Sequence, residues 1–139
     1  MNQQDYILVS APNAAGEEFL KQLSRRGIPT AVMVNNQTEY ERICSLGADR
    51  VIRVNTADKD SWKEFAPIAV AKIYLFEKSL NLCCRYAQMC RSWTKKPIYV
   101  ITGSHDPRLH YKKAGVNKVI HTIKNDISTL IADHFPPKP

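Results

Sequence analysis

The sequence predicts an α/β fold in three layers, in which a mostly parallel sheet of six strands is covered by helices on both faces. Three observations lead to this prediction. Short apolar runs alternate with amphipathic segments six times along the 139 residues. Gly27, Gly47 and Pro67 are placed to end three of the helices. No linker, internal repeat or low-complexity segment interrupts the alternation, which is typical of parallel strands joined by crossover helices.

The first strand, at residues 6–11, turns sharply into a helix. Its apolar run stops at Pro12 and Asn13, and small residues continue as far as Gly16. After the helix, a second apolar run occupies 30–34. Together these segments form a β-α-β unit, so the two strands are expected to be parallel.

The same patterns predict the remaining elements of one domain over residues 1–139. Further strands are expected at 50–54, 72–76, 97–102 and 118–120. Further helices are expected at 39–46 with Thr38 as cap, 60–67, 79–93, about 107–114 and 126–134. The proline-rich tail, 135–139, is expected to fray because proline cannot continue a helix.

Charge and hydropathy favour a cytoplasmic protein that does not insert into a membrane. No apolar stretch is long enough to span a bilayer, and the first residues lack the basic start of a signal peptide. The formal net charge is +7, but its basic pairs, Arg25-Arg26, Lys95-Lys96 and Lys112-Lys113, are scattered near predicted helix ends. There they would oppose the helix dipole, so a nucleic-acid partner is not expected.

The cysteines and histidines follow no metal-binding or redox spacing. There is no Cys-x-x-Cys pair, so the four cysteines are interpreted as small core residues of a reduced protein. Cys83 and Cys90 share one face of a predicted helix, which leaves a thiol site as an alternative.

The turn at 11–16 occupies the frame of the Gly-x-Gly-x-x-Gly sequence that approaches a pyrophosphate in dinucleotide-binding units. Only the third glycine, which packs the helix on the strand, is present. Glu17 and Glu18 would oppose a phosphate at the start of the helix. A purely structural turn and a nucleotide site therefore both stay open. The candidate cofactor-binding residues of the turn are Ala11, Asn13, Ala14, Ala15 and Gly16.

A repeated helix-Gly-x-x-x-Val-Ile pattern, at 46–52 and 113–120, accompanies this order of elements. With them the sequence resembles the Rossmann nucleotide-binding domain of potassium-transport regulators, the TrkA-N or RCK family, from residue 6 to about 134. The resemblance implies a regulatory domain that binds NAD(H), NADP or an adenine nucleotide. It also implies a homodimer and a membrane transporter or channel subunit as partner.

Two expected ligand positions depart from the family pattern. The family places an acidic residue for ribose hydroxyls at the end of the second strand, where this chain has Asn35 and Asn36. After the third strand Asn55 and Thr56 replace the family's Gly-Asp-Ala-Thr. Either the ligand differs, or the pocket has lost its ligand and serves as an interaction module.

The last predicted helix bears on the expected homodimer. It offers a wide apolar face that would either fold back on its own sheet or meet a second copy of the chain. That face consists of Ile123, Ile127, Leu130, Ile131 and His134.

No residue pattern nominates a catalytic nucleophile or base, so the sequence favours a binding protein over an enzyme. Tyr74 and Lys78 match the Tyr-x-x-x-Lys spacing of short-chain dehydrogenases, but the match begins inside a predicted strand, where residues four apart lie about 13 Å apart. Residues 16–52 also resemble the cofactor half of medium-chain alcohol dehydrogenases and quinone reductases. A small NAD(P)-dependent oxidoreductase, or a subunit of one, is therefore the enzymatic alternative.

Overall fold

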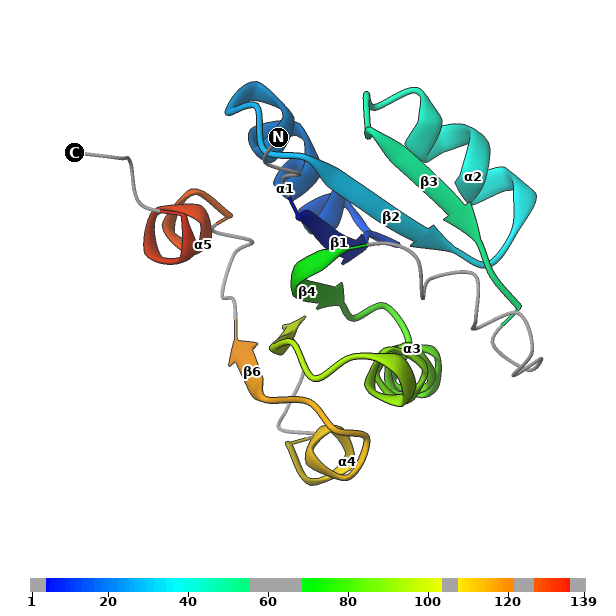
Figure 1. The fold of residues 1–139 in the computed structure, drawn as a ribbon, viewed down its shortest axis with the longest axis vertical. Helices are drawn as coiled ribbons and strands as arrows, with labels where there is room; N and C mark the ends of the chain where they lie inside the picture. The colour runs from blue at the N-terminus through cyan, green and yellow to red at the C-terminus, as the bar shows by residue number, and fades with distance from the viewer. Residues whose placement is uncertain (1–4, 56–68, 104–107, 122–126, 136–139) are drawn as a thin grey trace.

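The computed structural model of the chain describes residues 5–55, 69–103, 108–121 and 127–135. Strands and helices alternate through these residues as predicted (Figure 1). The helix expected at 60–67 lies outside them. The strands are β1 (Tyr6–Ser10), β2 (Thr30–Val34), β3 (Arg50–Arg53), β4 (Val70–Phe76), β5 (Ile98–Thr102) and β6 (Lys118–His121). The helices are α1 (Ala14–Arg25), α2 (Gln37–Cys44), α3 (Leu80–Trp93), α4 (Arg108–Lys113) and α5 (Ile127–His134).

The six strands form one sheet in the order β3-β2-β1-β4-β5-β6, and every pairing is parallel. β1 lies at the centre, where Leu8 is opposite Ala31 of β2 and Ile73 of β4. From β1 the chain runs outward to β3, returns past β1 to β4, and then runs outward on the other side. The strand order therefore reverses between β1 and β4.

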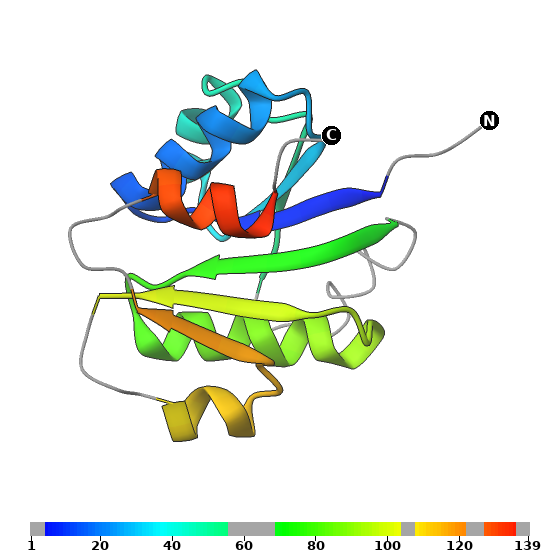
Figure 2. The same cartoon turned by 90° about the vertical axis from the view of Figure 1, so that its left-hand side faces the viewer.

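Helices cover both faces of this sheet, which confirms the predicted three-layer fold. α1, α2 and α5 lie on one face, and α3 and α4 lie on the other (Figure 2). Successive side chains of a strand point to opposite faces. Leu8 accordingly joins the core under α3 and α4, whereas Ile7 and Val9 join the core under α1, α2 and α5. Because both faces are covered, all five residues of β2 are buried, which explains its uninterrupted apolar sequence.

The described helices are shorter than the hydrocarbon core of a bilayer is thick. α3 has 14 residues, which corresponds to about 21 Å at 1.5 Å per residue, whereas the hydrocarbon core of a bilayer is about 30 Å thick. None of the helices within the described ranges is both long and apolar enough to cross a bilayer.

The apolar face of α5 packs on the sheet of its own chain, beside α1. Ile127, Leu130 and Ile131 are 2%, 5% and 4% exposed. Of the two alternatives left open by the sequence, the structure has the one in which the helix folds back. The wide apolar face expected to meet a second copy is therefore not exposed in the single chain. Ile123 lies outside the described residues.

An aromatic cluster explains why α5 docks there. The Tyr74 hydroxyl lies 2.8 Å from Nδ1 of His134 at the end of α5, and the Tyr74 ring stacks on Tyr99 with 5.1 Å between centroids. Phe135 packs against Tyr74 at 5.7 Å, and its carbonyl oxygen accepts a hydrogen bond of 2.6 Å from Arg26. Phe135 thus packs against the sheet, although the sequence placed it at the start of the fraying tail.

The burial of Tyr74 shows whether Tyr74 and Lys78 can act as a catalytic Tyr-x-x-x-Lys pair. Tyr74 is fully buried inside β4, whereas Lys78 is exposed after the strand. Burial raises the pKa of Tyr74, and the neighbouring Tyr99 raises it further. A catalytic tyrosine in a Tyr-x-x-x-Lys pair needs the opposite shift, so the spacing is a coincidence of sequence.

The prediction that all four cysteines are core residues is confirmed for Cys83 and Cys90, but it is wrong for Cys44, which is exposed at the end of α2, and Cys84 is only partly buried. Cys83 and Cys90 are buried in α3, and the Cys90 sulfur lies 4.0 Å from the sulfur of Met33. Burial raises the pKa of Cys83 to about 12 and also raises the pKa of Cys90. Both thiols therefore stay protonated near neutral pH, which argues against the alternative of a reactive thiol site.

Candidate nucleotide site

The candidate site lies where the sheet order reverses, at the carboxyl ends of β1 and β4. Ser10 and Leu75 are opposite each other there, although 65 positions separate them in the sequence. The chain leaves β1 toward α1 on one face of the sheet and leaves β4 toward α3 on the other. Parallel α/β folds bind their ligands where connections diverge in this way, and we call this place the crevice.

Gly16 is required for the packing of α1 on β1. An added Cβ atom would lie 2.7 Å from the Cα atom of Ala11, 2.8 Å from its Cβ atom and 3.2 Å from the Phe76 ring. Real Cβ atoms do not approach backbone so closely, so only glycine fits at this point of the helix. The expectation that the third glycine of the frame packs helix against strand is therefore confirmed.

Asn13 replaces a glycine of the frame and binds on both sides of the crevice. As the N-cap of α1, its Oδ1 accepts a hydrogen bond of 2.9 Å from the Gly16 amide. Its Nδ2 donates a hydrogen bond of 3.1 Å to the backbone oxygen of Glu77, just after β4. The amide thus joins the turn after β1 to the end of β4, at a position where dinucleotide-binding frames have no side chain.

The two carboxylates in the first part of α1 are directed toward protein groups. Glu17 forms an ion pair of 3.3 Å with Arg42 of α2. Glu18 accepts a hydrogen bond of 3.1 Å from Gln22, one turn later in the same helix. The repulsion that the sequence predicted between these carboxylates and a phosphate is therefore reduced, because Glu17 has a cationic partner.

Of the two asparagines that follow β2, one is a helix cap. Asn36 accepts a hydrogen bond of 2.8 Å from the Glu39 amide and so begins α2 at Gln37. The predicted cap, Thr38, was wrong because an asparagine two positions earlier can form the same bond. The Asn36 amide also donates to Asn35 Oδ1 at 3.0 Å. The Asn35 amide group remains exposed at the tip of β2.

The residues after β3 lie at the same end of the sheet, the carboxyl ends of the strands. The amide of Val54 donates a hydrogen bond of 2.8 Å to Val34, which continues the pairing of β3 with β2 beyond Arg53. Asn55 then follows as an exposed residue. Thr56 lies outside the described residues. The structure therefore brings the described candidate cofactor-binding residues to one end of the sheet, in the turns that follow β1, β2 and β3.

Sequence reasoning missed Glu77, which organises the other side of the crevice. Its Oε1 accepts a hydrogen bond of 2.6 Å from Thr102 at the end of β5. Its Oε2 accepts a hydrogen bond from the Tyr111 hydroxyl of α4. Together with the bond from Asn13, these contacts join four segments at one residue. The only signal in the sequence was a carboxylate that directly follows an apolar strand.

Tyr111 is a hydrogen-bond donor in this network. Tyr111 is fully buried, and burial together with its hydrogen bond to Glu77 raises the pKa of its hydroxyl. The phenol therefore keeps its proton near neutral pH and donates a hydrogen bond to the Glu77 carboxylate. Because Glu77 is held by β5 and α4, we interpret it as a positioning residue for this edge of the sheet.

The side of the crevice that faces α3 is filled by side chains. A hollow of about 10 Å³ remains there. This volume is roughly the room that one water molecule needs. Its walls are Ser10, Pro12, Phe76, Lys78, Ser79, Leu82, Cys83 and Tyr86.

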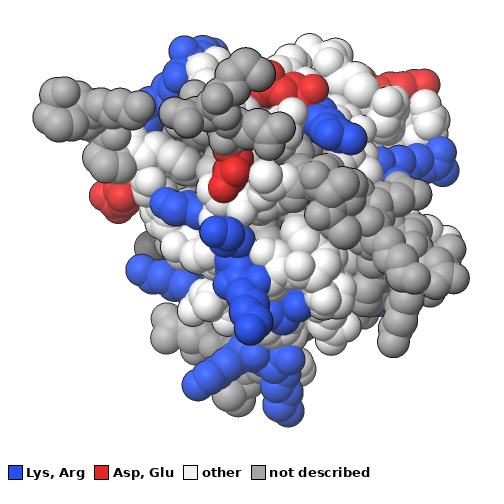
Figure 3. All heavy atoms as spheres, viewed as in Figure 1, with Lys and Arg blue, Asp and Glu red and all other residues white. Residues whose placement is uncertain are grey.

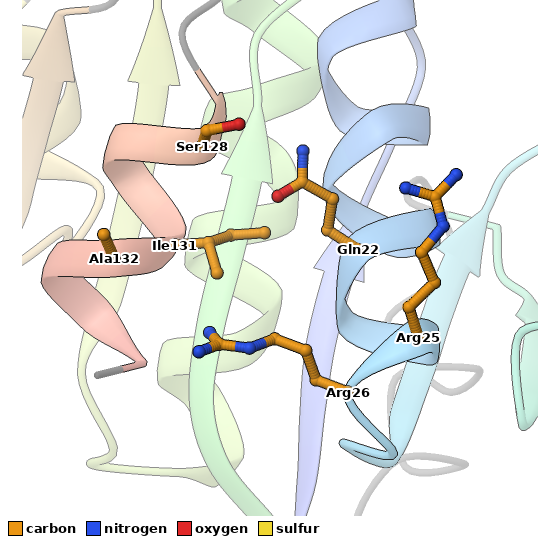
Figure 4. A pocket seen from close by; sticks show the side chains of 6 residues that line it. All are labelled: Gln22, Arg25, Arg26, Ser128, Ile131 and Ala132. Atoms are coloured by element: carbon orange, nitrogen blue, oxygen red, sulfur yellow. The ribbon is translucent and has the colours of Figure 1, made fainter. Parts of the chain in front are cut away.

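A larger hollow of about 460 Å³ lies elsewhere, between α1 and α5 (Figure 4). It is lined by Gln22, Arg25, Arg26, Ser128, Ile131 and Ala132. Arg26 reaches from the end of α1 toward α5, where it binds the Phe135 carbonyl. This hollow lies near the carboxyl end of α1, whereas the glycine turn is at the opposite end. It is therefore separate from the crevice.

Comparison with known proteins connects this geometry to solved structures. No protein-family model and no curated protein sequence matches the chain. The GsuK channel bound to NAD is 16% identical over 86% of this chain and 22% of that chain, with a TM-score of 0.72. The TrkA-N domain of the inner membrane protein ybaL from Escherichia coli is 14% identical over 97% and 99% of the two chains, with a TM-score of 0.69. The NAD(P)-binding domain of an exopolyphosphatase-related protein from Archaeoglobus fulgidus is 15% identical over 92% and 96%, with a TM-score of 0.71.

These matches cover different shares of the known proteins. The chain corresponds to 22% of the channel and to nearly the whole of the other two domains. At identities of 14–16%, the similarity concerns the fold. The chain thus has the Rossmann-like fold of RCK and TrkA-N domains, which confirms the resemblance seen in the sequence at the level of fold.

Proposed function

We propose that this chain is a regulatory domain that binds NAD(H), NADP or another adenine nucleotide where the strand order reverses. The observation that carries the proposal is the sharp turn from β1 into α1, packed at Gly16 beside the end of β4. Ligands of parallel α/β folds bind at this point. The NAD-bound GsuK channel and the NAD(P)-binding domain from Archaeoglobus fulgidus share the fold, which supports the same class of ligand.

The turn after β1 would hold the phosphates. Backbone amides at the start of a helix bind anions, because their hydrogens point outward and the helix dipole is positive there. Asn13 already occupies the amide of Gly16, so we assign the phosphate contact to the amides of Ala14 and Ala15. The close packing of Ala11 on Gly16 sets the position of these amides.

The turns after β2 and β3 would hold the ribose and base. The exposed Asn35 amide would donate a hydrogen bond to a ribose hydroxyl. Asn36 would support this contact from its place as the cap of α2. Asn55 and Thr56, after β3, complete the proposed site.

A second candidate function is an interaction module that binds no nucleotide. Two observations favour it: the Asn13 amide bound to the Glu77 backbone, and the hollow of only about 10 Å³ on the α3 side. The enzymatic alternative, a small NAD(P)-dependent oxidoreductase or its subunit, gains no support from Tyr74, which lies in the core.

A thermal-shift panel distinguishes these functions. NAD, NADH, NADP, ATP, ADP and AMP are added separately, and the ligand of the site should stabilise the protein by about 2.7 kcal/mol at a hundredfold excess over its dissociation constant. Ala14→Asp is the matched variant, because a carboxylate at the exposed start of α1 suits the helix but repels phosphate. The shift should disappear in this variant without loss of stability. The absence of a shift with every ligand would favour the interaction module.

The ligand preference should depend on Asn35. We expect Asn35→Asp to strengthen binding of ligands with a free 2′-hydroxyl, through one charge-assisted hydrogen bond, and to weaken binding of ligands with a 2′-phosphate, through repulsion. The expected change is about tenfold in the ratio of NAD to NADP affinity, which corresponds to about 1.4 kcal/mol. Titration calorimetry measures both affinities. Equal ratios in the two proteins would show that Asn35 does not contact the ribose.

We further propose a homodimer. Since the apolar face of α5 is covered within one chain, a dimer built on this helix would have to exchange α5 between two copies. Light scattering at micromolar concentration should then give twice the mass of one chain. A monomeric mass would contradict the proposal.

The proposed setting is one cytoplasmic domain over residues 1–139 that regulates a membrane transporter or channel subunit, with a link to potassium transport. The GsuK channel and its RCK domain share the fold of this chain, which supports this partner class. Co-purification with a candidate channel, with and without the ligand found in the thermal-shift panel, tests it.

A further inference from the structure

The net charge of the chain belongs to one part of the fold. Residues 80–121, which run from α3 to β6, contain eight Lys and Arg residues and one Asp, a net charge of +7. The rest of the chain contains 12 Lys and Arg residues and 12 Asp and Glu residues, so its net charge is zero. A charge imbalance of this kind between two parts of a protein indicates an anionic partner.

The fold brings several of these cations to one end of the sheet, the end at which the strands begin. In a parallel α/β fold, each helix ends near the end of the sheet at which the next strand begins. Among the described residues, five exposed lysines lie there: Lys95 and Lys96 before β5, Lys112 and Lys113 in the last turn of α4, and Lys118 in β6. We call them the lysine edge. Figure 3, viewed toward the ends at which the strands begin, shows Lys and Arg side chains in a nearly continuous line over β6 and α4.

Within the part of the chain that the structure describes, no carboxylate forms an ion pair with the lysine edge. The ion pair that the structure records among the described residues joins Glu17 and Arg42, far from this edge. The positive potential reaches α5, because Lys72 and Lys118 add to burial in lowering the pKa of His134. Along the sequence these basic residues lie near separate helix ends, whereas in the fold α3, α4 and β6 bring them together.

Arg91 holds this edge rigid without neutralising it. Its guanidinium donates to the carbonyls of Gly115, Thr94 and Lys96 and to the Asn117 side chain, at 2.7–3.2 Å. All of these acceptors are uncharged. The Asn117 side chain also accepts from the Ile98 amide at 2.8 Å, which fixes the starts of β5 and β6 relative to each other. The lysines therefore surround a preformed surface.

β6 is an edge strand, and a hollow lies beside its start. Among the described residues no strand pairs with its outer side, so backbone N–H and C=O groups of Lys118–His121 face outward. The hollow measures about 260 Å³. It is lined by Lys112, Val116, Asn117, Lys118 and Val119. Apolar walls and two ammonium groups thus adjoin an open row of backbone hydrogen-bonding groups.

We propose that β6 and the lysine edge bind an extended acidic segment of a partner protein. The segment adds as a strand beside β6, and its carboxylates pair with Lys112 and Lys118. Strand addition uses backbone hydrogen bonds, which a polypeptide offers and a nucleic acid does not. Successive side chains of an extended segment point to opposite sides, so alternating acidic and apolar residues gather the carboxylates on one side of the added strand and the apolar side chains on the other. Pairing of β6 with a second copy is opposed, because it would bring two sets of lysines together.

The test uses a fluorescein-labelled peptide of alternating Glu and Val, with fluorescence anisotropy as the readout. The peptide should bind, and binding should weaken as salt rises because the contacts are ionic. Lys112→Glu with Lys118→Glu should weaken binding at least about tenfold. The control is Lys21→Glu with Arg50→Glu, which makes the same charge change at exposed positions away from the lysine edge and should leave binding unchanged.

Further arms separate strand addition from other modes of binding. A peptide with Gln in place of Glu should lose binding, and so should one N-methylated at alternate residues, which keeps its carboxylates but lacks half of its amide donors. The proposal is overturned if the N-methylated peptide binds as well as its parent, or if single-stranded DNA or anionic phosphatidylserine vesicles compete more strongly than the peptide. It is also overturned if both charge-reversal pairs reduce binding equally. A melting curve confirms that each variant is folded.

Discussion

Gly16→Ala is expected to destabilise the protein, although the same exchange inside an ordinary helix stabilises it by up to about 1 kcal/mol. The reason is the 2.7 Å approach of an added Cβ atom to the backbone of Ala11. To relieve this contact, α1 would have to move away from β1. We expect a net loss of about 2 kcal/mol for Gly16→Ala and more than 3 kcal/mol for Gly16→Leu. Urea denaturation measures both.

The matched control is Ala14→Leu, two positions earlier in the same helical turn. Ala14 is exposed, so a larger side chain there should change the free energy of unfolding by less than about 0.5 kcal/mol. If Gly16→Leu unfolds at the same urea concentration as the wild type, the close packing of α1 on β1 is wrong. The turn proposed for phosphate binding would then lose its structural basis.

Removing the carboxylate of Glu77 is expected to have the second large effect. In Glu77→Leu the hydroxyls of Tyr111 and Thr102 lose their acceptor. A buried donor without a partner costs about 1–3 kcal/mol, and Tyr111 is fully buried. We therefore expect Glu77→Leu to lower the free energy of unfolding by about 2–4 kcal/mol, whereas Glu41→Leu, at an exposed glutamate of α2, should change it little.

A double-mutant cycle tests whether Tyr111 is the main cause. Tyr111→Phe should cost about 1 kcal/mol in the wild-type protein. In the Glu77→Leu background the same change should cost less, or stabilise, because it removes an unpaired hydroxyl. The coupling should be about 1–2 kcal/mol. Equal costs in both backgrounds would show that the two side chains do not interact.

The sequence alone determined the elements of this fold. Its apolar runs predicted β2 at 30–34 without error and the other strands to within two residues, since burial on both faces leaves an uninterrupted signal. Gly16 could be assigned a packing role because a strand that turns directly into a helix brings the two backbones close. These features depend on residues near one another in the chain.

Only the tertiary structure decided which segments meet. The alternation of strands and helices is compatible with several strand orders, and the observed order alone brings the end of β1 beside β4. The partners of Glu77 are 25 and 34 positions away, so no spacing rule could reveal them. Likewise, the apolar periodicity of α5 showed that one face is buried but not against what. The basic residues looked dispersed because a sequence records their separation along the chain, whereas a parallel sheet brings successive helix ends and strand starts to one edge.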